Sequence, residues 1–195
     1  MPLLSNGNSK LGRNIYSFSL PTSTCKHKTE YCRKYCYAKK GNFVFPNVVK
    51  HYASNLRHSY AKNFSRRIRE EIIQNGAEYI RIHPSGDFYN QKYFDKWLTI
   101  ATSSPKCEFL AYTRNYELDA SKIPPNFHLY FSIDSSTCFI NTTITHYALV
   151  APQKGKHMEL KGAFRVCDSK CYKCKACWSS KINVLFPMRG CKIEE

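Results

Sequence analysis

Seven of the ten cysteines in this chain of 195 residues lie in two short segments near its ends, residues 25–36 and 167–177. The N-terminal residues are polar and no apolar run approaches the ~18 residues of a membrane span, so we expect a cytoplasmic protein without a membrane anchor. Thiols in that compartment stay reduced, which favours metal ligation over a disulfide framework. With 43% hydrophobic residues, the chain is long enough to form a single domain over residues 1–195.

The first cysteine segment has the spacing Cys25-x6-Cys32-x3-Cys36. Three thiolates can hold three irons of a [4Fe-4S] cluster and leave the fourth iron open, whereas a pure electron carrier usually supplies four cysteines. Basic side chains near these thiols are expected to lower their pKa values and favour the thiolate, which is the ligating form. These basic residues are Lys26, Lys28, Arg33 and Lys34.

The second segment reads Cys167-x3-Cys171-x2-Cys174-x2-Cys177-Trp178, and its last three cysteines share the close spacing of bacterial ferredoxin loops. Zinc is the alternative metal, because four thiolates also form a tetrahedral structural site. A zinc ribbon separates its two cysteine pairs by a longer loop, so the spacing favours iron-sulfur. The sequence leaves open whether the two segments form two sites or share one cluster.

The other three cysteines are assigned no metal. Cys107 and Cys138 lie in apolar contexts and are expected to be buried as small hydrophobic side chains. Cys191 is expected to be a free thiol, with a spare ligand as the alternative.

Helical and strand-like segments alternate along the chain. Apolar residues from Val49 to Ile72 recur at steps of three and four, which predicts one amphipathic helix between Pro46 and Gly76, and a second helix is predicted over residues 93–100. Strands are predicted at 15–20, 79–83, 108–113, 127–133, 147–150 and 163–166. This order predicts an α/β fold with a mainly parallel sheet, as an open or partial (β/α) barrel, followed by a cysteine-rich C-terminal segment.

Polar residues follow several predicted strands. Ser85, Gly86 and Asp87 come after the second strand, and Arg114 comes after the third. Ligands bind at the carboxyl edge of parallel sheets, although the same residue types also favour turns. We weigh a site and a turn equally for Asp87 and Arg114, and we favour a turn for Asp134. The nearby His83 is expected to be structural.

Thirty basic residues against fourteen acidic ones give a net charge of +16, which indicates nucleic acid or another anionic partner. A solvated helix face is the alternative for the basic run at residues 50–69. The candidate phosphate contacts in that run are Arg57, Lys62, Arg66, Arg67 and Arg69.

Six motifs distributed in order along nearly the whole chain resemble those of the phage and viral proteins grouped as gene product 88. The motifs are Ser5-Asn6-Gly7-Asn8-Ser9-Lys10-Leu11-Gly12, Ser17-Phe18-Ser19-Leu20-Pro21, Cys36-Tyr37-Ala38, His83-Pro84-Ser85-Gly86-Asp87-Phe88, Ala111-Tyr112-Thr113-Arg114 and Cys171-x2-Cys174-x2-Cys177-Trp178. This resemblance implies a viral protein in the cytoplasm of a host cell.

More distantly, the chain is similar to radical S-adenosylmethionine enzymes, which place a three-cysteine [4Fe-4S] loop after the first strand of a partial barrel. Their usual loop is C-x3-C-x2-C with an aromatic residue before the last cysteine; here the intervals are x6 and x3, and Tyr35 precedes Cys36. This resemblance implies that S-adenosylmethionine binds the open iron and that Asp87 and Arg114 orient cofactor and substrate. The implied cofactor contacts are Tyr35, Ser85, Gly86 and Asp87. The alternative is a non-catalytic iron-sulfur protein that transfers electrons with a partner protein or binds nucleic acid.

Overall fold

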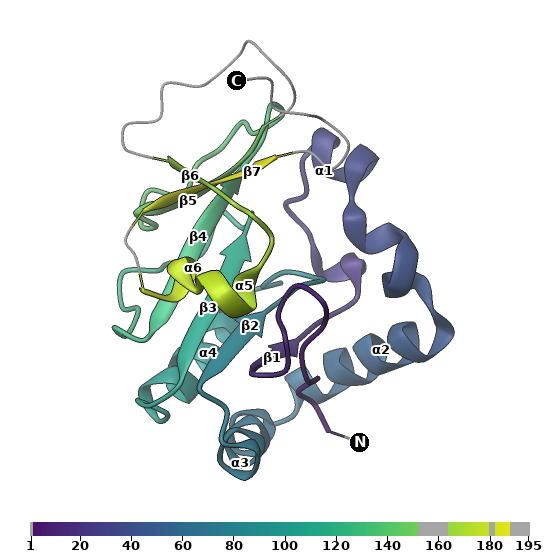
Figure 1. Cartoon of the computed structure of the whole chain (residues 1–195), viewed down its shortest axis with the longest axis vertical. Helices are drawn as coiled ribbons and strands as arrows, with labels where there is room; N and C mark the ends of the chain where they lie inside the picture. The colour runs from purple at the N-terminus through teal and green to yellow at the C-terminus, as the bar shows by residue number, and fades with distance from the viewer. Residues whose placement is uncertain (1, 152–163, 180–181, 188–195) are drawn as a thin grey trace.

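Short runs rich in β-branched and aromatic residues form seven parallel strands in one open sheet (Figure 1). The computed structural model describes residues 2–151, 164–179 and 182–187, and the strands lie in the order β1-β2-β3-β4-β5-β7-β6. Their bounds are β1 Ile15–Phe18, β2 Tyr79–Ile82, β3 Glu108–Thr113, β4 Phe127–Ile133, β5 His146–Ala151, β6 Phe164–Val166 and β7 Asn183–Pro187. The α/β fold with a parallel sheet is therefore confirmed, in its open form.

The strand β7 was not predicted from the sequence. It is a short apolar run that ends in Pro187, and it lies between β5 and β6 in the sheet. Its register places Val184 beside Ala148 of β5 and Arg165 of β6. The strand thus forms by pairing on both sides, and so short a run carries little signal of its own.

The predicted single helix over residues 46–75 is wrong, because the structure has two helices there. They are α2 Pro46–Tyr60 and α3 Phe64–Asn75. Ala61 adopts an extended conformation between them, and the Lys96 ammonium donates hydrogen bonds to the carbonyls of Ser59 (2.7 Å) and Ala61 (3.1 Å). A side chain from the next helix, α4 Gln91–Thr102, therefore satisfies carbonyls that the interruption frees.

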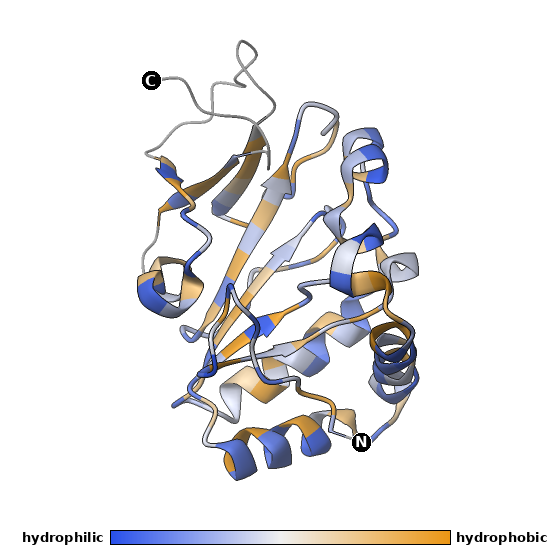
Figure 2. Ribbon diagram, turned by 45° about the vertical axis from the view of Figure 1, so that its right-hand side comes forward, coloured by the Kyte–Doolittle hydropathy of each residue, from blue (hydrophilic) through white to orange (hydrophobic). Residues whose placement is uncertain are grey.

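Helices α3 and α4 cover one face of the sheet and build the larger core (Figure 2). Trp97 of α4 and Phe64 of α3 are fully buried against Phe18 of β1, with ring centroids 5.3 to 5.6 Å apart in edge-on pairs. Figure 2 shows the apolar stripes of these helices turned toward the strands and their polar stripes turned to solvent. This amphipathic packing fixes the sheet as a rigid platform.

The opposite face is covered by the cysteine-rich segment and an N-terminal loop. Two one-turn helices, α5 Cys171–Cys174 and α6 Ala176–Ser179, lie over it, and Trp178 is buried against Leu110 and Tyr130. The N-terminal loop packs closely here: Gly12 has a φ of +73°, and a methyl group in its place would lie 2.6 Å from Tyr172 Cβ. Within the described ranges, no helix is long and apolar enough to cross a membrane.

The first cysteine segment lies between β1 and α2, beyond the carboxyl ends of the first strands (Figure 1). It contains helix α1 Glu30–Tyr35 and three 3-10 turns, η1 Thr22–Thr24, η2 Tyr37–Lys39 and η3 Gly41–Val44. The two cysteine segments thus occupy the carboxyl edge and one face of the same sheet.

Candidate functional site

Asp87 lies at the carboxyl edge of the sheet and organises the ends of β2 and β3. Its Oδ1 accepts hydrogen bonds from the Phe88 N–H (2.7 Å) and the Thr113 hydroxyl (2.7 Å), and its Oδ2 accepts one from the Arg114 N–H (2.9 Å). Burial raises the pKa of this carboxyl, and the hydrogen bonds oppose that shift. Asp87 therefore joins two neighbouring strand ends and retains acceptor capacity on Oδ2.

Arg114 and Asp134 form an ion pair beside it. The Arg114 Nη1 lies 2.7 Å from Asp134 Oδ2, and the Asp134 side chain has no solvent exposure. The same Oδ2 accepts a hydrogen bond from the Thr29 hydroxyl (2.6 Å), while Oδ1 accepts one from the Ser136 N–H (2.9 Å). Asp134 is therefore a turn residue, as expected. It is also part of the candidate site, and this second role was not predicted from the sequence. Its place directly after β4, matching Asp87 after β2, was the available signal.

The Cys25 loop is anchored to these strand ends at several points. The Leu20 N–H donates to the Ser85 carbonyl (2.9 Å), and the Asp87 N–H donates to Thr24 Oγ1 (3.1 Å). Further along, Thr29 caps helix α1 by accepting a hydrogen bond from the N–H of Cys32 (3.1 Å). Because Thr29 also donates to Asp134, the cap fixes the loop to β4.

Gly86 allows the Cys25 loop to approach the end of β2. It has a φ of +85°, and a methyl group there would lie 2.6 Å from Leu20 Cβ and 2.9 Å from Thr24 Oγ1. The described contacts of Ser85 and Gly86 are thus with the loop that carries Cys25. Both residues therefore help to position this loop, and the cofactor contact implied for them stays a prediction.

The three thiols of this loop come together beside Asp87 and Arg114. A hydrogen bond from the Cys32 thiol lowers the pKa of Cys36 to about 6, and the same bond, with burial, raises the pKa of Cys32. Burial and the Asp87 charge raise the pKa of Cys25 to about 12, against smaller opposing effects of Lys28 and Arg114. The expected lowering by basic neighbours is therefore outweighed at Cys25 and Cys32.

The aromatic residue that contacts a strand end is Tyr37, which sequence reasoning missed. Its hydroxyl donates a 2.6 Å hydrogen bond to the Pro84 carbonyl after β2. The predicted Tyr35 ring is 44% exposed and packs against Tyr31 with centroids 4.8 Å apart. Tyr37 thus fixes the chain directly after Cys36, while Tyr35 lies at the surface of α1.

His83, at the start of the same loop, is buried and has a φ of +55°. Its Nε2 lies 2.9 Å from the Tyr93 hydroxyl, and its ring packs edge-on against Phe88. Burial lowers the pKa of His83 to about 3, so the ring is neutral in the folded protein. These contacts agree with the structural role expected for it.

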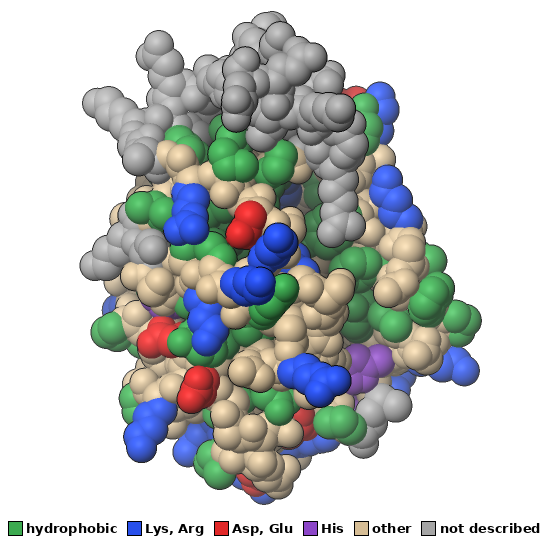
Figure 3. Space-filling view, in the orientation of Figure 1, with side chains coloured by type: hydrophobic (Ala, Val, Ile, Leu, Met, Phe, Trp, Pro, Cys, Tyr) green, Lys and Arg blue, Asp and Glu red, His purple; other side chains and the backbone are tan. Residues whose placement is uncertain are grey.

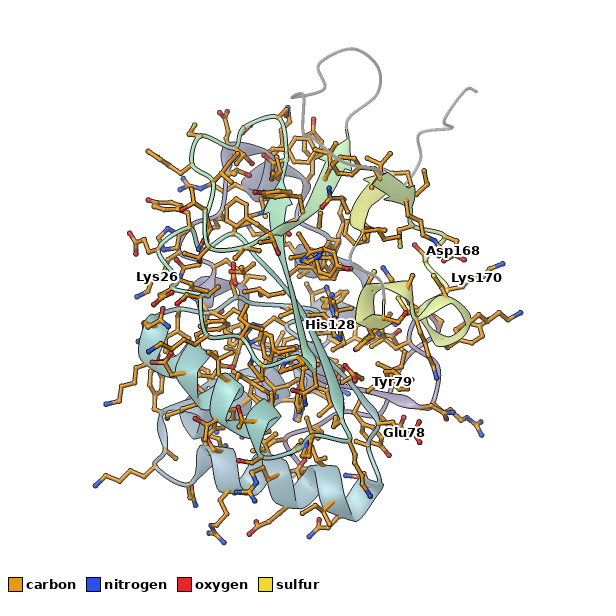
Figure 4. The ribbon with its side chains drawn as sticks, turned by 90° about the vertical axis from the view of Figure 1, so that its left-hand side faces the viewer. Lys26, Glu78, Tyr79, His128, Asp168 and Lys170 are labelled. Atoms are coloured by element: carbon orange, nitrogen blue, oxygen red, sulfur yellow. The ribbon has the colours of Figure 1, made fainter. Side chains whose placement is uncertain are left out.

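The four cysteines of the second segment line one small cavity on the face of the sheet. Its lining comprises Arg165, Val166, Cys167, Asp168, Cys171, Cys174, Lys175, Ala176, Cys177, Trp178, Ile182 and Val184. Figure 4 shows this segment, marked by Asp168 and Lys170, on the opposite side of the molecule from Lys26, the neighbour of Cys25. The structure therefore gathers the seven predicted ligands into two separate sets.

Cationic and hydroxyl groups surround the second set. The Tyr112 hydroxyl donates a hydrogen bond to Cys177, and the Arg81 guanidinium lies 3.9 Å from the centroid of the Tyr112 ring. Burial raises the pKa values of Cys171 and Cys177, while the positive charges of Lys10 at Cys171 and of Arg81 at both thiols lower them. Burial therefore has the larger effect on both thiols, and the positive charges partly offset it.

The remaining cysteines differ from one another. Cys107 is buried, as predicted, but the prediction for Cys138 is wrong. Cys138 is exposed in the loop after β4, with its thiol 3.7 Å from the Ser136 carbonyl, because the strand ends at Ile133. Cys191 lies outside the described residues.

Among the residues that the structure describes, no group of three or more His, Cys, Asp and Glu side chains forms a site that could hold a metal ion. A [4Fe-4S] cluster makes a different demand, because each thiolate binds a different iron and the sulfur atoms need not converge on one point. The chemistry of each cysteine set, thiols gathered on a few residues of loop or one-turn helix, fits a cluster in this respect.

Comparison with known proteins gives related phage sequences. The family model described as gene product 88 matches residues 2–192. The gene 88 protein of Mycobacterium phage L5 is 26% identical in an alignment 210 positions long, which covers 87% of this chain and 85% of that protein. The gene 88 protein of Mycobacterium phage D29 is 25% identical in an alignment 206 positions long, with the same coverage of both chains. No solved structure matches significantly. These matches support the resemblance to the gene product 88 proteins. They do not support the resemblance to the radical S-adenosylmethionine enzymes.

Proposed function

The chain belongs to the gene product 88 family, and we propose that it is an iron-sulfur protein that holds a [4Fe-4S] cluster on Cys25, Cys32 and Cys36. One observation carries the proposal: the loop brings three thiols to the carboxyl edge of a parallel sheet, beside Asp87 and Arg114. This edge is where open α/β sheets bind their ligands, because the strands fix the loops that follow them.

Three protein ligands leave one iron free, and a cluster bound in this way supplies an open coordination position and a one-electron carrier. We further propose that the ligand at this position is S-adenosylmethionine and that the protein is a radical S-adenosylmethionine-like enzyme. Among the described residues Asp87 Oδ2 accepts one hydrogen bond, from the Arg114 N–H, and it would accept a second from the amino group of this ligand. In the described part of the chain, the Arg114 bonds to Asp134 and Ser132 both use Nη1, and Nη2 and Nε would donate to an anionic group.

The substrate class follows from charge. The net charge is +16, and Arg57, Lys62 and Arg69 are exposed on or beside α2 and α3, which supports an anionic substrate such as nucleic acid. Arg66 pairs with Glu70 at 2.9 Å, so it contributes less free positive charge. Binding to a single-stranded oligonucleotide should weaken steeply as salt rises; affinity that does not change across a salt series would contradict a phosphate-driven interaction.

The second candidate is a non-catalytic iron-sulfur protein, an electron carrier or a nucleic-acid-binding module. The observation that favours it is that Asp87 and Arg114 already have protein partners. Their hydrogen bonds and ion pair therefore have a structural role that requires no ligand. A carrier would also need a reductant protein as its partner.

Anaerobic purification with iron, sulfide and zinc analysis tests cluster binding. We expect iron and sulfide in the wild-type protein, a loss of part or all of the iron in Cys32→Ser, and no loss in the control Cys138→Ser, which changes an exposed cysteine outside both sets. Stoichiometric zinc without sulfide would exclude the cluster.

Addition of S-adenosylmethionine to the reduced protein separates the two candidates. A radical enzyme shows a changed electron paramagnetic resonance spectrum and releases 5′-deoxyadenosine. An unchanged spectrum with no 5′-deoxyadenosine would leave only the non-catalytic candidate.

A further inference from the structure

The cysteine-rich segment has little secondary structure of its own to hold it in place. Helices α5 and α6 have four residues each, far below the length at which a helix is stable in isolation. Two residues other than glycine have left-handed backbone conformations here, Ser169 with a φ of +62° and Lys175 with +47°. Such conformations persist where the surroundings enforce them. The position of the segment therefore depends on its tertiary contacts, among them the buried Trp178.

A centre bound by the four thiols of the segment would hold its short elements together. Cys167 follows β6, Cys171 and Cys174 begin and end α5, and Cys177 lies in α6, so the set spans every element of the segment. All four line the same cavity. One centre bound by all four would join the end of β6 to both helices and to the sheet beneath them.

Positive charge gathers around this cavity. Arg165 and Lys175 line it with the single acidic residue Asp168, and Lys10 and Arg81 interact with Cys171 from the N-terminal loop and from β2. Figure 3 shows Lys and Arg side chains collected over α5 and α6. Four thiolates around a [4Fe-4S] cluster carry net negative charge, which this basic surrounding offsets.

Each cysteine set interacts electrostatically within itself. Cys171 and Cys177 both interact with Cys167, whereas Cys25 and Cys32 interact with Cys36. The segments that carry the two sets, α1 and α5, are well separated in Figure 1. A single cluster that takes ligands from both ends of the chain does not fit this arrangement.

We propose that Cys167, Cys171, Cys174 and Cys177 form a second metal centre, closed by four thiolates, which fastens the C-terminal segment to the sheet. The centre is an iron-sulfur cluster, in which each thiolate binds a different iron, because the described residues form no group of three or more ligands that could hold a single metal ion. Unlike the proposed site at Cys25, it has no open position, so it would bind no substrate.

The test compares metal content between two variants of the full chain, Cys174→Ser and Cys32→Ser, purified without oxygen. Each variant should lose only part of the metal, and the two losses should add to the wild-type content. Cys138→Ser, an exposed cysteine outside both sets, is the control and should lose none. The iron lost from Cys174→Ser should be accompanied by sulfide, and zinc lost in its place would contradict a second cluster.

Two outcomes would overturn the proposal: full metal content in Cys174→Ser, or loss of all metal in each single variant, which would mean one shared cluster. If Cys32→Ser keeps all its metal while Cys174→Ser loses it, the second centre stands and the proposed function at Cys25 fails.

A measurement on the wild-type chain covers the case in which Cys174→Ser does not fold. Iron(II) and sulfide added anaerobically to the metal-free reduced protein should restore the visible thiolate-to-iron charge-transfer absorption of two clusters per chain. Hydrogen exchange at residues 164–179 should slow at the same metal equivalent. Absence of that absorption, or exchange unchanged by metal, would contradict the proposal.

Discussion

Replacing Gly86 with alanine tests whether the close approach between the Cys25 loop and the end of β2 builds the site. Gly86 has a φ of +85°, and the added methyl group would lie 2.6 Å from Leu20 Cβ, 2.9 Å from Leu20 O and 2.9 Å from Thr24 Oγ1. Two of these three atoms belong to backbone or to the base of a side chain, so rotation of a side chain cannot relieve the contact. The loop must therefore move away from the end of β2. Cys25 should move with it, because it directly follows Thr24.

The expected cost has two parts. The left-handed backbone costs a residue with a Cβ about 1–2 kcal/mol. Overpacking at a tight contact adds about 1–3 kcal/mol. Gly86→Ala should therefore lower the free energy of unfolding by roughly 2–5 kcal/mol. Gly76→Ala is the matched control, because Gly76 has a φ of +57° with nothing within 4 Å of the added methyl group. It should show the backbone cost alone.

The assay is urea unfolding of the two variants and the wild type in the metal-free reduced state, with iron per chain measured separately after anaerobic purification. Gly86→Ala should unfold at lower urea than Gly76→Ala and should bind less iron. Equal midpoints for the two variants would refute the close-approach argument. Full iron content in Gly86→Ala, despite the lower stability, would refute the link from this contact to the cysteines.

Three further changes have defined outcomes. Asp134→Asn removes the charge that pairs with Arg114 and should lower the unfolding free energy by about 3–5 kcal/mol, measured by urea unfolding; a loss below about 1 kcal/mol would mean that solvent screens the pair. His83 has its pKa lowered to about 3, below the unfolded value of ~6.5, so its contribution to stability should fall as the pH drops from 6.5 to 3. His83→Asn should flatten this pH dependence in metal-free protein. If the slope of unfolding free energy against pH is unchanged, His83 is not the group responsible. Lys96→Met removes a donor from the Ser59 and Ala61 carbonyls, of which Ala61 keeps the Phe64 N–H, and should cost about 1–3 kcal/mol in thermal unfolding, against no change if water replaces the ammonium.

Local patterns in the sequence predicted most of the fold. The strands at residues 108–113 and 127–133 match β3 and β4 in both bounds, because both are apolar runs that are buried along most of their length. The break between α2 and α3 was not predicted, since residues 61–63 contain neither glycine nor proline and the stabilising donor, Lys96, comes from another helix. Strand β7 likewise depends on two neighbours for its identity.

By itself, the sequence determined the family, the α/β parallel fold, the two cysteine segments and the polar residues that follow the strands. These are properties of local spacing and composition. Only the tertiary structure separated the cysteines into an edge set and a face set, because crossovers carry the chain to different sides of the sheet. It also decided that Asp134, taken for a turn residue, pairs with Arg114 and holds Thr29, since contacts across 20 and 105 positions leave no trace in local spacing.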